Sequence, residues 1–233
     1  MNRKISYLAI LLVAFLFTTS LQAKEEMREV SAFSKIALRI SGKVYVEQGE
    51  KQSIRVVADP ETLEEIITEV KDRTLNIRYS NSNIFRNWNP GKVEIYITVP
   101  EVDGLSISGS GDIESEHIKT RILDLAVSGS GNITIETLSA EKVDAAVSGS
   151  GNIRLNKGGV AEELRARISG SGNIDASGFE ARKVDVQTSG SGNCSVISNG
   201  QLNVRVSGSG SVYYSGNPSI DSSISGSGKV KKR

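Results

Sequence analysis

The tetrapeptide SGSG recurs at a nearly constant spacing through the second half of this chain. Successive copies begin 20, 20, 21, 20, 18 and 18 residues apart, at Ser108, Ser128, Ser148, Ser169, Ser189, Ser207 and Ser225. Self-similarity at a period of about 20 residues is typical of a solenoid, in which each repeat forms one coil that buries its apolar face by stacking on its neighbours. The repeat therefore predicts a solenoid.

Apolar and polar residues alternate before each motif, as in LDLAVSGSGNI at 123–133 and VDAAVSGSGNI at 143–153. Leu123, Leu125 and Val127 share one side of this segment, and Asp124 lies on the other. A period of two indicates a half-buried strand rather than a helix. Coils of 18–21 residues built from short strands match an all-β parallel β-helix, in which equivalent residues of successive coils stack about 4.8 Å apart.

The motif itself is interpreted as a corner of each coil. If the alternation continues through SGSGN, the serines face outward and the glycines face the interior, where the missing side chain lets the walls of the coil approach. The asparagine that follows tolerates a left-handed backbone conformation. The expected corner residues are Gly109, Gly111, Gly129, Gly131, Gly149, Gly151, Gly170, Gly172, Gly190 and Gly192, with Asn132, Asn152, Asn173 and Asn193.

The outward serines of the motif are the candidate binding surface. Stacked coils would align them into a rank of hydroxyl groups that could meet a glycan or another copy of the protein. Mutual hydrogen bonding along the rank, with no ligand, is the alternative. The rank consists of Ser110, Ser130, Ser150, Ser171, Ser191, Ser209 and Ser227. Ser108 and its equivalents, two residues earlier in each motif, join this rank.

Residues 1–23 have the pattern of an export signal, with basic Arg3 and Lys4, an apolar stretch and a polar exit. Cleavage is expected after Ala23, with Ser20 as the alternative. The apolar stretch is short for a membrane span, which needs about 20 residues, so no span is expected after cleavage. Because Cys194 is the only cysteine, a lipid anchor on a cleavage-site cysteine is not expected. The protein is predicted to be periplasmic or to lie at the cell surface.

Residues 24–104 lack the motif but contain similar alternating segments, which we interpret as irregular first coils of one continuous domain with 105–230. The segment at about 60–72 predicts a helix, because Asp59 suits an N-cap, Pro60 suits the first position, and apolar residues follow at helical spacing. Residues 229–233 are expected to form a solvated basic tail.

Composition excludes several functions. Without the signal the chain holds 26 basic and 27 acidic residues, a balance that argues against nucleic acid as a partner. His117 is the only histidine, so neither a histidine-based metal site nor a serine triad can form. Cys194 replaces the isoleucine of other copies and is expected to be a buried, unreactive thiol. No cofactor or metal is expected.

A row of aspartates is compatible with an enzymatic function. Carboxylates one coil apart are close enough to act as acid and base or to hold calcium. Each recurs by repetition, however, with lysines nearby in sequence, so a solvated strand face is the favoured interpretation. The row consists of Asp124, Asp144, Asp185 and Asp221, interrupted by Arg165 and Asn203.

The signal, the irregular β-rich first part and the tandem SGSGDI, SGSGNI and SGSGNC motifs together resemble a bacterial family, the putative auto-transporter adhesins with a head GIN domain. The resemblance covers most of residues 30–230 and implies a right-handed parallel β-helix without catalytic residues. It implies a surface adhesin or envelope scaffold, with a glycan or an envelope or host-surface ligand as partner, and homo-oligomers are compatible with it. A carbohydrate-active enzyme and a periplasmic small-molecule binder are the alternatives.

Overall fold

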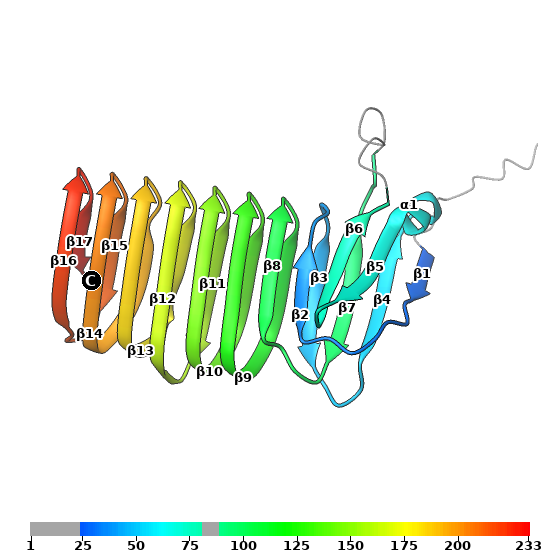
Figure 1. Cartoon of the computed structure of the whole chain (residues 1–233), viewed down its shortest axis with the longest axis horizontal. Coiled ribbons are helices and arrows are strands. Elements are labelled where there is room, and N and C mark those ends of the chain that lie inside the picture. Colours follow the sequence, from blue (N-terminus) through cyan, green and yellow to red (C-terminus); the bar gives the residue numbers. More distant parts are fainter. Residues whose placement is uncertain (1–23, 81–88) are drawn as a thin grey trace, which may run out of the picture.

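The computed structural model describes residues 24–80 and 89–233, so the expected export signal lies outside the described residues. The chain forms an elongated parallel β-solenoid whose coils stack along its long axis (Figure 1). The described residues contain seventeen strands and one short helix. The all-β solenoid predicted from the repeat is confirmed.

Each coil is flattened into two facing layers of strands that meet at the SGSG motif (Figure 1). Strand β9 (Asp112–Gly129) shows the arrangement, because its first part pairs with β3 and its second part pairs with β8. We call the layer that leads into the motif the pre-motif sheet and the layer that leaves it the post-motif sheet. β9, β10 (Asn132–Gly149), β13 (Asn173–Gly190) and β14 (Cys194–Gly208) pass through both layers.

The remaining strands belong to one layer each. The pre-motif sheet adds β5 (Ile66–Lys71), β6 (Thr74–Tyr79), β2 (Lys35–Leu38), β8 (Gly104–Gly109), β12 (Val160–Gly170) and β16 (Ser219–Gly226). The post-motif sheet adds β1 (Lys24–Met27), β4 (Ser53–Ala58), β7 (Glu94–Val99), β3 (Lys43–Gln48), β11 (Asn152–Gly158), β15 (Ser211–Ser215) and β17 (Lys229–Lys232).

The interior is filled by rows of apolar side chains that repeat from coil to coil. Parallel pairing aligns equivalent residues, so that Ile113, Ile133 and Ile153 lie on adjacent strands. The row continues through Ile174 and Cys194, and all five residues are at most 1% exposed. Each coil thus buries its apolar side chains against the next, as the alternation of the sequence predicts.

The N-terminal end departs from the parallel pattern. β5 and β6 form an antiparallel hairpin whose turn residues, Asp72 and Arg73, have φ of 52° and 59°. β4 pairs antiparallel with both β7 and β1. The helix α1 spans only Pro60–Glu65, so the helix expected at about 60–72 is wrong beyond that point. Ile66, Ile67, Thr68 and Val70 are β-branched residues that favour a strand, and they pair with β6.

The C-terminal segment is also more ordered than expected. Residues 229–232, predicted as a solvated tail, form β17 and pair in parallel with β15. Val230 packs against the core, whereas the three lysines of β17 are exposed. The guanidinium of Arg233 lies 4.4 Å from the centre of the Tyr213 ring. The basic end of the chain therefore belongs to the last coil.

The two glycines of each motif have different roles, which corrects the expectation that both face the interior. The first glycine, such as Gly129 with φ 125°, adopts a conformation that a residue with a Cβ rarely adopts. The second, such as Gly131, is buried, and a Cβ there would collide with the Gly111 carbonyl oxygen and the Ile107 side chain. The corner therefore needs close approach at both glycines, and in addition a positive φ at the first.

The asparagines after the motif do not adopt the expected left-handed conformation. In the described part of the chain, positive φ among non-glycine residues occurs at Asp72 and Arg73. Asn132, Asn152 and Asn173 instead begin strands, and each side-chain amide donates a hydrogen bond to the preceding coil. Nδ2 of Asn152 lies 2.7 Å from Oδ1 of Asn132, and Nδ2 of Asn173 lies 2.9 Å from Oδ1 of Asn152. The asparagines form a hydrogen-bonded ladder because the first glycine already supplies the turn.

We expect Gly131→Ala to lower the free energy of unfolding by about 2 to 3 kcal/mol, because the new methyl group overpacks the corner against backbone. The matched control is Gly159→Ala, since a Cβ at Gly159 meets no atom within 4 Å. The control should change stability by less than about 0.5 kcal/mol. Urea denaturation of both variants tests this, and equal stabilities would contradict the role assigned to the second glycine.

A threonine lies in one of the rows that fill the interior. Thr188 aligns with Ile168 on one side and Val206 on the other, and it is 3% exposed. Its hydroxyl oxygen is buried and, among the described residues, has no hydrogen-bond partner. A buried hydroxyl without a partner costs stability because it has lost its hydrogen bonds to water.

We therefore expect Thr188→Val to raise the free energy of unfolding by about 1 to 2 kcal/mol, because valine keeps the shape and removes the buried hydroxyl. Thr188→Ser is the paired control, since it keeps the hydroxyl and loses a methyl group, and it should destabilise the fold. Thermal unfolding of the three proteins measures both effects. A valine variant less stable than the wild type would show that the hydroxyl is satisfied.

Candidate ligand-binding surface

The serines predicted as a binding surface lie at the tips of the tight corners and are exposed. Their backbone amides bond to the preceding coil, as in Ser130 N to Gly109 O at 2.9 Å and Ser150 N to Gly129 O at 2.8 Å. Within the described residues, their hydroxyls form no hydrogen bonds with one another. Because each corner stacks on the preceding one, a row along this edge of the solenoid contains Ser110, Ser130, Ser150, Ser171, Ser191, Ser209 and Ser227.

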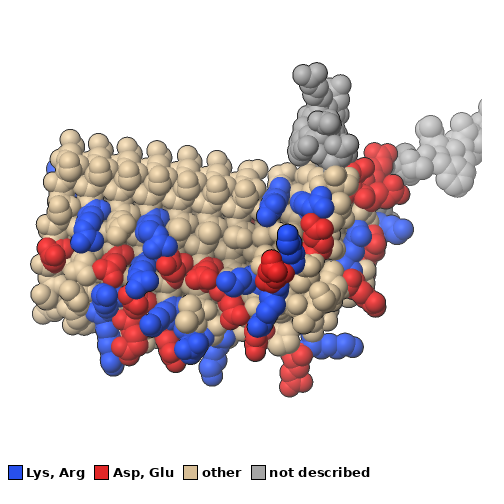
Figure 2. Space-filling view, in the orientation of Figure 1, with Lys and Arg blue, Asp and Glu red and all other residues tan. Residues whose placement is uncertain are grey.

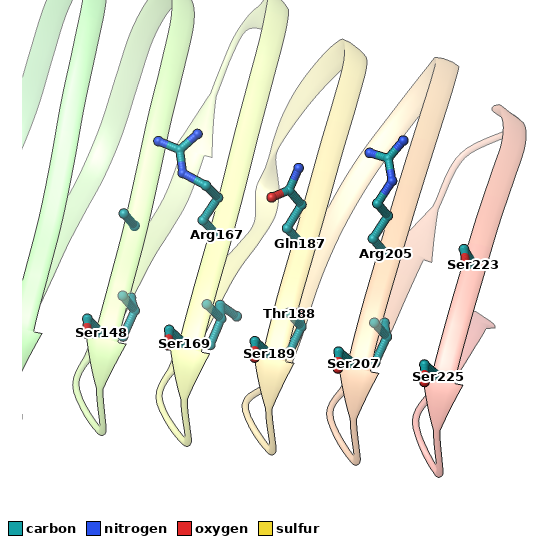
Figure 3. Close-up of a pocket in the computed structure, with 14 residues that line it drawn as sticks. Ser148, Arg167, Ser169, Gln187, Thr188, Ser189, Arg205, Ser207, Ser223 and Ser225 are labelled. Carbon is teal, nitrogen blue, oxygen red and sulfur yellow. The ribbon is translucent and has the colours of Figure 1, made fainter.

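A shallow groove of about 790 Å³ runs beside this edge, on the outer face of the pre-motif sheet. It crosses five coils, from β10 to β16. One side is a row formed by the first serine of each motif, and the other side is formed by the residue two positions earlier (Figure 3). The serine row is Ser148, Ser169, Ser189, Ser207 and Ser225, and the facing row is Ala146, Arg167, Gln187, Arg205 and Ser223.

Of the two sets of motif serines, one lines this groove. The tip serines do not line this groove, whereas the first serines of the motif do. Strand parity places both sets outward, but only the first serine lies on the flat face of the sheet. The signal that could have identified the groove is the long side chain two residues before it, in RARISGSG and VRVSGSG.

The groove has polar side chains along both rows and carries positive charge. Its charged lining residues are Arg167 and Arg205, and its lining includes no carboxylate. Arg167 Nη2 lies 2.6 Å from Oδ1 of Asp144, which belongs to the next row of the sheet. In the space-filling view the band beside the corners is almost free of charged residues, which gather on the other half of this face (Figure 2).

Three of the four aspartates in the predicted row are engaged by neighbouring side chains. Asp124 Oδ2 lies 3.2 Å from Lys35 Nζ, and Asp144 is paired with Arg167. Asp185 accepts a hydrogen bond from Asn203 at 2.7 Å. Parallel register aligns Asp124 with Asp144, but Arg165 and Asn203 interrupt the row as the sequence shows. These contacts are those of a strand face held together by ion pairs and hydrogen bonds.

A second groove, of about 650 Å³, lies on the outer face of the post-motif sheet near the N-terminal end. Tyr45 and Tyr96 stack there with ring centres 5.0 Å apart. His117 also lines this groove, together with four glutamates: Glu47, Glu114, Glu116 and Glu136. Glu114 accepts a hydrogen bond from Lys43 and so raises the pKa of that amine. Sequence reasoning missed this groove, although KVYVEQ and VEIYITV place both tyrosines at the same outward register.

The sequence of this chain is similar to that of a known protein family. The sequence matches the family described as "Putative auto-transporter adhesin, head GIN domain" over residues 32–218. The chain belongs to this family. The resemblance seen in the repeats is thus confirmed. Among curated proteins, no sequence matches the chain.

Solved structures share the whole architecture. A putative adhesin of Bacteroides fragilis is 29% identical, with a TM-score of 0.86, and the match covers 92% of this chain and 98% of that one. A putative lipid binding protein of Parabacteroides distasonis is 24% identical, with a TM-score of 0.72, covering 91% of this chain and 97% of that one. A putative adhesin of the same species is 23% identical, with a TM-score of 0.70 and coverage of 92% and 98%. The last two show a shared fold.

Cys194 lies in the interior of this head GIN domain and is 0% exposed. Burial raises the pKa of the Cys194 thiol to about 12. Because the thiolate is the nucleophilic form, the folded protein should not react through this residue at moderately alkaline pH.

We expect Cys194 to resist a chromogenic disulfide reagent at pH 8.5 in the native protein. In concentrated urea it should react at the rate of an exposed thiol, because the unfolded residue recovers an ordinary pKa of about 8.5. Stopped-flow absorbance measures both rates, and Cys194→Ala provides the blank. Rapid reaction of the native protein would contradict the burial of this side chain.

Proposed function

We propose that this chain is an exported, non-enzymatic adhesin or envelope-binding protein that holds an extended ligand along the outer face of its pre-motif sheet. The groove that repeats over five coils is the observation that supports the proposal. Its two rows are built from equivalent positions of successive coils, and in one of the rows the same serine hydroxyl recurs on every coil along the axis of the solenoid. Such a surface suits a ligand with its own linear repeat.

The pattern of residues 1–23 supports export, with cleavage after Ala23 and no lipid anchor. In the portion that the structure describes, no helix is long and apolar enough to cross a membrane. The similarity to proteins named as adhesins supports a place at the cell surface.

Two alternative functions are less well supported by the contacts. An enzyme acting through the aspartate row would need carboxylates free for proton transfer, but Asp124 and Asp144 are ion-paired. A binder of lipids or small molecules would need a deep, mostly apolar pocket that encloses most of the ligand. The interior rows of this chain are instead occupied by packed side chains such as Leu138 and Phe179, both 0% exposed.

The experiment is a glycan and surface-polymer array probed with protein comprising residues 24–233. We expect binding to at least one extended polysaccharide, with no shortening of the polymer on prolonged incubation. Ser189→Tyr, which fills the middle of the groove, should weaken that binding about tenfold, the equivalent of 1.4 kcal/mol. Tyrosine suits a strand, so the fold should persist.

Ser195→Tyr is the matched control, because Ser195 lies on an outward position of the post-motif sheet, between Asp175 and Tyr213. It should bind as the wild type does. Equal losses in the two variants, or no binding of the wild type to any polymer, would contradict the proposal. Protease treatment of intact cells would in addition distinguish a surface location from a periplasmic one.

A further inference from the structure

We propose that the groove takes an acidic polysaccharide, whose carboxylate or sulfate groups are held by Arg167 and Arg205. This inference deepens the proposed function and rests on it. It starts from the position of the two arginines, which occupy equivalent sites two coils apart with Gln187 between them (Figure 3). The separation along the axis is roughly 10 Å at the spacing of stacked strands.

The charge of the groove is unbalanced at Arg205. Its guanidinium is exposed and has no ion-pair partner within the described residues. Arg167 shares its guanidinium with Asp144 and retains further N–H donors, because a guanidinium carries five. The nearest aspartates belong to the adjacent row and do not line the groove. An anionic group in the groove would therefore find two cations and no competing carboxylate on its walls.

Guanidinium groups recognise carboxylates and sulfates with paired N–H donors. Facing them, five serine hydroxyls stand at intervals of about 4.8 Å, over a length of roughly 19 Å. Hydroxyls donate and accept hydrogen bonds, which matches the many hydroxyls of a sugar chain. The groove thus combines an anion site on two of its five coils, separated by one coil, with a hydroxyl on every coil, an arrangement suited to a sugar polymer that carries acidic groups along its length.

Other polyanions fit less well. Nucleic acid binding depends on many neutralised phosphates and, for single strands, on aromatic side chains that stack with bases, whereas this groove has two cations and no aromatic lining residue. Peripheral membrane binding needs an inserted apolar face or a polybasic cluster. Neither is present among the lining residues.

The test uses polygalacturonate and chondroitin sulfate as probes, with dextran as the neutral polymer, and affinity electrophoresis or biolayer interferometry as the readout. Wild-type protein should bind an acidic polymer, and its affinity should fall as the NaCl concentration rises. The variant Arg167→Gln/Arg205→Gln should lose about tenfold or more in affinity, since two charged hydrogen-bonding groups are removed. Circular dichroism of the variant verifies that the fold is retained.

Arg154→Gln is the matched control, because Arg154 is an exposed arginine on the outer face of the post-motif sheet. It should bind as the wild type does. Equal affinity of the double arginine variant and the wild type, or equal binding of acidic polymers and dextran, would overturn the inference. If neutral glycans alone bind and Ser189→Tyr weakens them, the proposed function stands while this inference fails. If no polymer binds, both fail.

Discussion

The distance between stacked coils governs this structure. Hydrogen bonding between parallel strands holds neighbouring coils about 4.8 Å apart, and this spacing must be kept at the corner as well as in the sheets. At the corner the Gly109 carbonyl accepts hydrogen bonds from both Ser130 N and Gly131 N, at 2.9 and 3.1 Å. A side chain on Gly129 or Gly131 would collide with the backbone of the preceding coil. The SGSG motif recurs because each corner has to meet this constraint.

At this constant spacing, the residues at each position of the repeat align from coil to coil and form a row. Rows that point inward are mostly apolar, because a polar side chain there has no water and few partners. Thr188, whose buried hydroxyl has no hydrogen-bond partner among the described residues, shows the cost. In half-buried rows, polar side chains form hydrogen bonds with the equivalent residues of neighbouring coils, as in the asparagine ladder. Outward rows are under no packing constraint, so residues as different as Ala146, Arg167 and Ser223 occupy equivalent sites. Ligand chemistry is therefore expected in the outward rows.

The repeat period, the strand parity and the parallel register could be predicted from sequence because each is a property of local alternation multiplied over many copies. Predictions failed where the sequence is not repeated or where two conformations compete. Ile66 and Ile67 suit the apolar face of a helix, but pairing with β6 decides for a strand. Asn132 suits a left-handed turn, but Gly129 already provides it. The groove with Tyr45 and Tyr96 brings together residues far apart in sequence, a placement that depends on which strands become neighbours.

The antiparallel N-terminal end has a consequence for how the chain reaches a single structure. Near-identical motifs have almost equal affinity for one another, so a coil could dock on the wrong copy and leave out a whole repeat at little local cost. β1, β4 and the β5–β6 hairpin have sequences that differ from the repeat. Among the described residues, β4 joins this group to β7 and β6 joins it to β2. Because these strands pair in one place, they fix the position of the first coil, and each later coil is placed relative to it. A repetitive protein thereby acquires a defined length and a defined order of its outer side chains.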